Sequence, residues 1–288
     1  MSKRGASLIT VPELAAEGLS AYLSEHLSRR FGSVDATLTE LIPAVARISL
    51  ECIGNSDALY HNVEHTMLVT QVGYDIMKGR ALLTPTYPID FAHVLVACLL
   101  HDIGYVRGIL QGDGPDGYVI DTNGKKTKLP RGSSDAALTP FHVDRSKLYV
   151  MDRIGNSEIL DAARIADAIE YTRFPSPGGA GDNEDNEEGS LVRAADLIGQ
   201  LGDPHYLRKA NALYLEFEEV GMNRQLGYAT PADLTDKYPQ FYWNSVSAHI
   251  QTAIRYLNVT SSGRQWIANL YGNVFRAERE LSLSGPQR

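Results

Sequence analysis

The stretch that decides the fold is an apolar run that ends in a histidine and an aspartate: Val94-Leu95-Val96-Ala97-Cys98-Leu99-Leu100-His101-Asp102-Ile103-Gly104. The chain is nearly continuously apolar from Ile89 to Leu100, and such a segment predicts a central, buried helix. Burying an ionised carboxylate is costly unless it is paired or binds a metal. Asp102 therefore needs a positively charged partner, and a metal shared with His101 would supply one.

The rest of the chain is also typical of helices. Apolar residues recur three and four positions apart, and Pro or small polar residues stand at several of the expected helix starts. One further helix is expected to begin at a cap among Asn55, Ser56 and Asp57 and to run through Met77. The other predicted helices cover residues 11–27, 36–53, 141–154, 158–171, 191–201, 211–220, 242–257 and 263–281. The sequence thus predicts an all-α fold.

One segment, residues 112–139, departs from this helical pattern. It is rich in Gly and Pro, and Thr122-Asn123-Gly124 stands between two short runs, Tyr118 to Asp121 and Lys125 to Leu129. Asn-Gly between such runs indicates a β-hairpin. We expect an insertion near the functional site, in the position of a lid. The whole chain, 1–288, is predicted to be a single domain with a core over about 36–220 and closing helices over 240–283.

Composition excludes several classes of protein. Hydrophobic residues make up 43% of the chain and charged residues 22%, which is ordinary for a globular protein. The net charge of −8 argues against a nucleic-acid-binding surface, which needs clustered Lys and Arg. The two cysteines indicate no disulfide framework. No signal peptide and no run of 18 apolar residues occurs, so we expect a cytoplasmic protein without a membrane span. The acidic run 182–188 is expected to be a solvated surface loop.

Two more groups of polar residues interrupt predicted helices. His61 and His65 are four residues apart, so they would share one face of a helix. Asp196 stands alone among apolar neighbours and poses the same burial problem as Asp102. These three polar groups are best reconciled if they converge, because imidazoles and carboxylates around one centre suit Mn²⁺, Fe²⁺, Co²⁺ or Zn²⁺. The alternative is that each group makes separate caps, salt bridges or backbone hydrogen bonds.

The order and context of these residues resemble the HD-domain superfamily of metal-dependent phosphohydrolases. The resemblance covers roughly residues 55 to 220 and implies an all-α, HD-domain-like helical bundle. In that superfamily a His, a His-Asp pair and a distant Asp hold a divalent metal, Mg²⁺ included. Carried over residue by residue, the metal ligands would be His65, His101, Asp102 and Asp196.

A narrower resemblance concerns the class I cyclic nucleotide phosphodiesterases. It rests on Tyr60-His61-Asn62-Val63-Glu64-His65, on Val69-Thr70-Gln71 and on Ala195-Asp196-Leu197. It implies that His61 is the general acid and that Asp102 also bridges to a second metal. The chain departs from this family after Asp102, where it continues Ile103-Gly104-Tyr105, and no counterpart of the purine-selecting Gln near the C-terminus is evident.

Further residues are candidates for the substrate or for a second metal. His142 is the one histidine between the His-Asp pair and Asp196, while Arg145 and Lys147 follow it and are candidates for phosphate oxygens. Asn62 is a fourth candidate. A solvated helix face is the alternative interpretation of the two cations. Weaker candidates are Glu170, Thr172, Tyr206 and Arg208, whereas His26, His93, His205 and His249 are assigned to packing or to the surface.

The sequence therefore predicts a metal-dependent phosphohydrolase that acts on a small phosphorylated substrate. A nucleotide or a cyclic nucleotide is one candidate substrate. Two alternatives remain open at this point. One is a di-iron oxygenase, which in relatives of this superfamily needs two additional His ligands, and the other is a regulatory domain that binds a nucleotide without turning it over.

Overall fold

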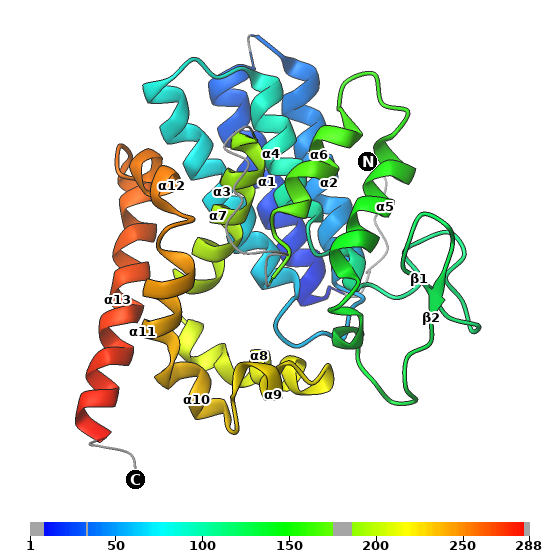
Figure 1. Ribbon diagram of the computed structural model, residues 1–288. Coiled ribbons are helices and arrows are strands. Elements are labelled where there is room, and N and C mark those ends of the chain that lie inside the picture. The colour runs from blue at the N-terminus through cyan, green and yellow to red at the C-terminus, as the bar shows by residue number, and fades with distance from the viewer. Residues whose placement is uncertain (1–8, 33, 175–185, 285–288) are drawn as a thin grey trace.

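The computed structural model describes residues 9–32, 34–174 and 186–284, and most of them lie in helices (Figure 1). The N-terminal part contains α1 (Val11–Phe31), α2 (Ala36–Ile53), α3 (Val63–Leu83), α4 (Pro88–Leu100), α5 (His142–Ile154), α6 (Ala162–Glu170) and α7 (Glu187–Leu201). The C-terminal part contains α8 (Tyr206–Glu219), α9 (Met222–Leu226), α10 (Pro231–Asp236), α11 (Tyr238–Phe241), α12 (Gln251–Leu257) and α13 (Ser261–Ser284). Short 3₁₀ turns η1 (Ile103–Tyr105) and η2 (Asp135–Leu138) and a π-helical turn η3 (Tyr242–Val246) connect them. The expected all-α class is confirmed.

Local sequence explains where the first helices begin. Thr10 and Glu13 form a reciprocal capping box at α1, and the Asp35 carboxylate accepts from the Leu38 amide at α2. Pro88 occupies the first turn of α4, where its missing N–H costs nothing. These starts fall at, or one residue from, the predicted positions.

Helix α4 forms the centre of the bundle. Every residue from Phe91 to Leu100 is buried, and α4 contacts α2, α3, α6 and α7. The buried apolar residues form one cluster that extends from Ala16 on α1 to Ala277 on α13. The apolar run from Val94 to Leu100 is therefore part of the core helix, and His101 and Asp102 follow its C-terminal end.

Small residues bring the neighbouring helices of this core close together. A Cβ atom on Gly73 of α3 would lie 2.8 Å from the Cys98 sulfur of α4. A Cβ atom on Gly199 of α7 would lie 2.9 Å from the backbone of Val69 on α3. Both distances are shorter than ordinary van der Waals contact, so only glycine permits this approach. The close approach of α3 to α7 brings the segments of His65 and Asp196 side by side.

The predicted hairpin is present. Strands β1 (Tyr118–Val119) and β2 (Lys126–Thr127) pair antiparallel, with Tyr118 opposite Thr127, and Gly124 in the connection has a φ of 73°. Figure 1 shows the hairpin projecting beside α5, away from α8 to α11. The lid that we expected here is not formed by the hairpin, because within 112–139 only Thr139 lines the cavity described below.

Two further expectations need correction. Residues 242–257 do not form one helix, because the π-helical turn η3 and a turn over 247–250 precede α12. Residues 182–185 of the acidic run lie outside the described residues. Glu187 and Glu188 begin α7, where they pair with Arg80 and Arg164 rather than with solvent alone.

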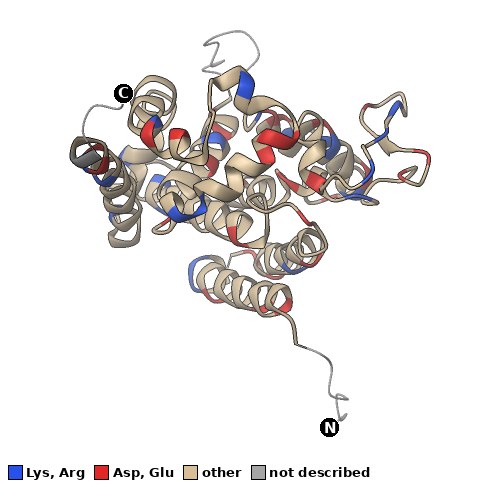
Figure 2. Cartoon of the chain, turned by 90° about the horizontal axis from the view of Figure 1, so that it is seen from below, with Lys and Arg blue, Asp and Glu red and all other residues tan. Residues whose placement is uncertain are grey.

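Among the described residues, no helix combines the length and the apolarity needed to span a membrane. Figure 2 shows basic and acidic positions distributed among the helices.

Candidate metal centre and active-site cavity

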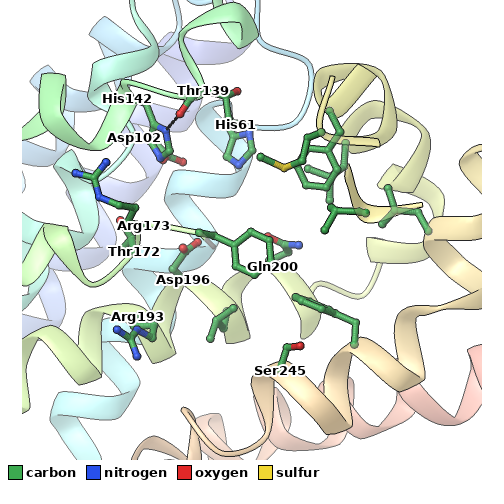
Figure 3. A pocket seen from close by; sticks show the side chains of 18 of the residues that line it. His61, Asp102, Thr139, His142, Thr172, Arg173, Arg193, Asp196, Gln200 and Ser245 are labelled. Carbon is green, nitrogen blue, oxygen red and sulfur yellow. Dashed lines mark hydrogen bonds and ion pairs between the residues drawn. The ribbon is translucent and has the colours of Figure 1, made fainter. Parts of the chain in front are cut away.

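A cavity of about 350 Å³ lies between the N-terminal bundle and the helices α8 to α11. His61, Asp102 and His142 gather at one end of it, and Asp196 and Gln200 of α7 face it further along (Figure 3). Pockets of about 300–1,000 Å³ are typical of small-molecule sites. The residues predicted from sequence and this cavity thus occupy the same place in the fold.

The core of the polar end is a buried group of three side chains from two helix ends. His65 comes from the first turn of α3, and His101 and Asp102 come from the end of α4. The His65 and His101 Nε2 atoms are 3.3 Å apart, and Asp102 Oδ2 lies 3.0 Å from His101 Nε2 and 3.4 Å from His65 Nε2. Their side chains are at most 3% exposed, so water screens them little.

The orientation of His101 decides which atoms face the centre of this group. Its Nδ1 lies 2.8 Å from the Cys98 carbonyl oxygen, which can only accept, so Nδ1 carries the hydrogen. In the neutral ring, Nε2 then carries no hydrogen, and its lone pair points at the carboxylate of Asp102. Asp102 Oδ2 is buried, and its neighbours are the Nε2 atoms of His101 and His65, which can satisfy it only when they carry hydrogen. A positive charge is needed among these atoms, either as extra protons on the imidazoles or as a cation.

The shifted pKa values also indicate that positive charge is favoured among these side chains. Burial disfavours the charged form of His65, but hydrogen bonds to Asp102 and Asp196 outweigh it and raise its pKa to about 10. Burial likewise opposes ionisation of Asp102, but the neighbouring His101 outweighs it and holds the pKa of that carboxyl well below its usual range. The donor set of imidazoles and carboxylates, with a buried carboxylate oxygen that needs a protonated imidazole or a cation, fits a divalent metal ion.

Asp196 completes the predicted set from the cavity side. Its side chain is 20% exposed, and its Oδ1 atom lies 3.2 Å from His65 Nε2 and 3.7 Å from His101 Nε2. Asp196 is thus less enclosed than the other three residues and touches both imidazoles. The structure brings together all four predicted ligands, which come from three helices.

His61 lines the cavity, but not in the way the sequence suggested. Helix α3 begins at Val63 with Asn62 as its N-cap, so His61 lies in the preceding bend and the helix predicted from residue 55 is wrong in its start. The two rings still approach, with centroids of His61 and His65 5.5 Å apart. His61 also stacks on Tyr105 at 4.8 Å.

Glu216 of α8 fixes the position of His61. Its Oε2 atom lies 2.5 Å from His61 Nδ1, and its Oε1 atom accepts from the Tyr60 and His61 amides. Burial opposes protonation of His61, but the Glu216 charge outweighs it and raises the pKa of the ring. Burial raises the pKa of Glu216, but the positive charge of His61 outweighs burial, so the pKa of Glu216 is lowered overall.

Sequence reasoning missed Glu216. A signal was available, because Leu213, Glu216 and Phe217 share one face of α8 and the flanking two are apolar. A carboxylate on an apolar face is buried only when it has a partner, and Glu216 is 2% exposed.

His142 lies at the site, at the first residue of α5. Its Nδ1 atom lies 2.6 Å from the Thr139 carbonyl oxygen, so Nδ1 carries the hydrogen and Nε2 is left facing Asp102 Oδ1 at 3.8 Å. Burial lowers the pKa of His142, which favours the neutral ring. Gly104 permits this proximity, because a Cβ atom there would lie 2.0 Å from the His142 carbonyl oxygen.

Arg145 is placed differently from the prediction. Its side chain is fully buried and does not line the cavity. The guanidinium donates to the carbonyl oxygens of Gly104, Val106 and Val119 and to both carboxylate oxygens of Asp113. No donor pair is left for a phosphate, so Arg145 instead ties α5 to the turn after Asp102 and to the hairpin.

The other two candidates also have structural partners. Lys147 lies 2.7 Å from the Glu170 carboxylate and does not line the cavity. The Asn62 amide oxygen accepts from the Glu64 and His65 amides and its nitrogen donates to the Leu59 carbonyl, which are the contacts of a helix cap. The solvated-face alternative suits Lys147, which is about one-third exposed.

The cations that do line the cavity are Arg173 and Arg193, which sequence reasoning did not single out. Arg173 pairs with Asp144 and Glu170, and Arg193 donates to the Tyr171 carbonyl and approaches His249. His249 lines the cavity too, although it was assigned to packing or surface. Of the weaker candidates, Thr172 and Tyr206 also line it.

Comparison with known proteins gives a family but no described relative. A family model described as Npun_R2479-like matches residues 9–280, which is almost the whole chain. No curated protein matches the sequence.

Proposed function

The chain therefore belongs to the Npun_R2479-like family, and we propose that it is a metal-dependent phosphohydrolase that cleaves a small phosphate ester. One observation carries the proposal. His65, His101, Asp102 and Asp196, from three separate helices, converge with their ligand atoms facing one another at the end of a cavity. The order of these residues along the chain, similar to that of HD-domain phosphohydrolases, supports the same activity.

His65, His101, Asp102 and Asp196 are the proposed ligands, and Mn²⁺, Fe²⁺, Co²⁺, Zn²⁺ or Mg²⁺ is the proposed cofactor. When bound, such an ion supplies Lewis-acid activation of water and of the phosphoryl group. The protein contributes the fixed orientation of the donors. The Cys98 carbonyl holds the tautomer of His101, and the burial of the three inner ligands excludes competing water.

His61 is the proposed general acid. Glu216 binds its Nδ1 atom, so Nε2 is the ring nitrogen that remains for the substrate, and the raised pKa favours the protonated ring. As the P–O bond breaks, the proton on Nε2 moves to the leaving oxygen and the ring becomes neutral. Stacking on Tyr105 restricts rotation of the ring while it does so.

Two further groups have proposed roles in the cavity. Arg193 lines the cavity and replaces Arg145 and Lys147 as the candidate for phosphate oxygens, whereas all three nitrogens of Arg173 already bond to Glu170 and Asp144. The Nε2 atom of His142 and the Oδ1 atom of Asp102 are the proposed ligands of a second metal ion.

The test is a screen of the metal-reconstituted protein against nucleotides, cyclic nucleotides and generic phosphate esters. The His61→Ala variant separates the roles within the site. It should retain the metal and lose turnover of esters with poor leaving groups by about 10²–10⁴-fold, while esters of p-nitrophenol lose less, because their leaving group needs no proton.

His205→Ala is the matched control, because His205 is exposed and lies outside the cavity. This variant should keep wild-type turnover on both kinds of ester. Metal-loaded wild-type protein that hydrolyses none of the esters, while remaining folded, would contradict the proposal.

A further inference from the structure

The cavity extends beyond the polar cluster, and its far wall is made of hydrocarbon. Helices α8 to α11 supply this wall, which we call the apolar chamber. Its side chains are Leu213, Phe217, Met222, Leu226, Leu234 and Phe241. Hydrocarbon side chains offer no hydrogen bonds to phosphate oxygens, so the chamber suits another part of the substrate.

Two tyrosine hydroxyls at the cavity wall are bonded within the protein. The Tyr238 hydroxyl donates to the Leu201 carbonyl oxygen at 3.3 Å, and the Tyr206 hydroxyl is hydrogen-bonded to Gln200. A ligand with several donors and acceptors would leave some of them unpaired when buried here, and each such group is costly. A hydrocarbon ligand has no such groups.

The chamber is continuous with the candidate active site. One cavity of about 350 Å³ is lined both by His61 and Asp102 and by the apolar side chains of Phe217 and Leu234. This size is that of an organic ligand rather than of a phosphate ion. A single molecule with a phosphate at one end and an apolar group at the other would fill it.

We infer that the substrate is the phosphate ester of an alcohol with a bulky apolar group, and that the apolar chamber binds that group. The inference rests on the proposed function, because it places the phosphate at the metal ligands. It names the substrate class, and it disfavours a nucleoside as the alcohol, since the sugar and base would bring polar edges into the chamber.

Binding of alkylphosphonates tests this without turnover, because their C–P bond is not a hydrolysable ester. Methyl-, butyl- and hexylphosphonate are titrated calorimetrically into the metal-loaded protein. Each methylene that enters the chamber should tighten binding by roughly threefold to fourfold. Hydrolysis of methyl, butyl and hexyl phosphate is measured in parallel, and kcat/KM should rise with chain length.

A pair of variants on α8 locates the effect. Phe217→Gln places an amide in the chamber and should weaken hexylphosphonate binding by about tenfold while leaving methylphosphonate unchanged. Leu215→Gln is the matched control, because Leu215 lies on the same helix, is 54% exposed and is not part of the chamber. It should bind both phosphonates like the wild type.

The two measurements distinguish the two proposals. Chain-length-dependent binding without hydrolysis of any ester would support the chamber and contradict the proposed function. Hydrolysis with affinity that is independent of chain length would overturn the inference and leave the proposed function standing. Tighter binding of a nucleoside monophosphate than of hexylphosphonate would also overturn it.

Discussion

Replacing Arg145 with Met should destabilise the protein strongly, although the residue lies outside the cavity. The guanidinium is fully buried and makes hydrogen bonds to three backbone carbonyls and to Asp113. Methionine retains most of the apolar volume of the arginine stem. The substitution therefore removes the charge and its donors and leaves the Asp113 carboxylate buried without its counter-ion.

The magnitude follows from that stranded carboxylate. Removing one partner of a buried ion pair costs about 3–5 kcal/mol, and the three carbonyls that lose a donor act in the same direction. For a protein of this size the loss corresponds to a fall in Tm of roughly 10 °C. Much of it should return in the Arg145→Met/Asp113→Asn double variant, because no unpaired charge is then buried and the side-chain amide oxygen can still accept from the backbone amides around Asp113.

Urea denaturation followed by circular dichroism measures these free energies of unfolding. Arg153→Met is the matched control, since Arg153 lies on the same helix with a side chain that is 61% exposed, and its ion pair with Asp152 is exposed too. A loss of stability in Arg145→Met no larger than that in Arg153→Met would refute the reasoning. So would a double variant that is less stable than Arg145→Met.

Three other outcomes are expected. Glu216→Gln should reduce turnover of poor-leaving-group esters by about 10–100-fold, with the metal content unchanged. Because the charge of Glu216 raises the pKa of His61 and the general acid must be protonated, the alkaline limb of the pH profile should shift to lower pH, and an unchanged profile would exclude a positioning role. Burial raises the pKa of Asp113, but the hydrogen bond to Arg145 outweighs burial and lowers this pKa overall. The ionised carboxylate therefore stabilises the fold above the pKa of Asp113 in the unfolded chain, which is about 4, and this stabilisation is lost as the pH falls through the pKa in the folded protein. The difference in unfolding free energy between wild type and Asp113→Asn, measured by denaturation from pH 7 to 2.5, should accordingly decrease only at acidic pH. A difference that instead decreases toward neutral pH would contradict a lowered pKa of Asp113. Gly104→Ala should lower Tm by several degrees in a thermal melt, because its Cβ would overlap the His142 carbonyl oxygen, and a wild-type Tm would contradict this contact.

Local patterns in the sequence were enough for much of the fold. The uninterrupted apolar run before His101 identified the core helix, and Asn-Gly identified the hairpin. The start of α3 was misplaced because Asn55, Ser56 and Asp57 are as good caps as Asn62, and only packing around His65 selects among them. The spacing of apolar residues over 242–257 does not indicate that this segment divides into a π-helical turn and α12.

The candidate site was predictable where burial forces a partner. His101, Asp102 and Asp196 each follow or interrupt apolar residues, and the four proposed ligands meet. The prediction for Arg145 was wrong because the sequence does not distinguish a cation that binds phosphate from a cation that binds backbone carbonyls. Glu216 is about 150 residues from His61, and only the tertiary fold joins them.

Metal analysis of the wild-type protein and of Asp102→Ala tests the central claim most directly. Both proteins are incubated with Mn²⁺, Fe²⁺, Co²⁺, Zn²⁺ or Mg²⁺, desalted, and assayed for bound metal and for phosphate release, with circular dichroism to establish folding. Asp152→Ala is the control, since that carboxylate is exposed. We predict about one or two bound ions in the wild type and the control, and loss of both metal and activity in folded Asp102→Ala. A folded wild-type protein that retains none of these metals, or an Asp102→Ala variant that binds them equally well, would contradict the claim.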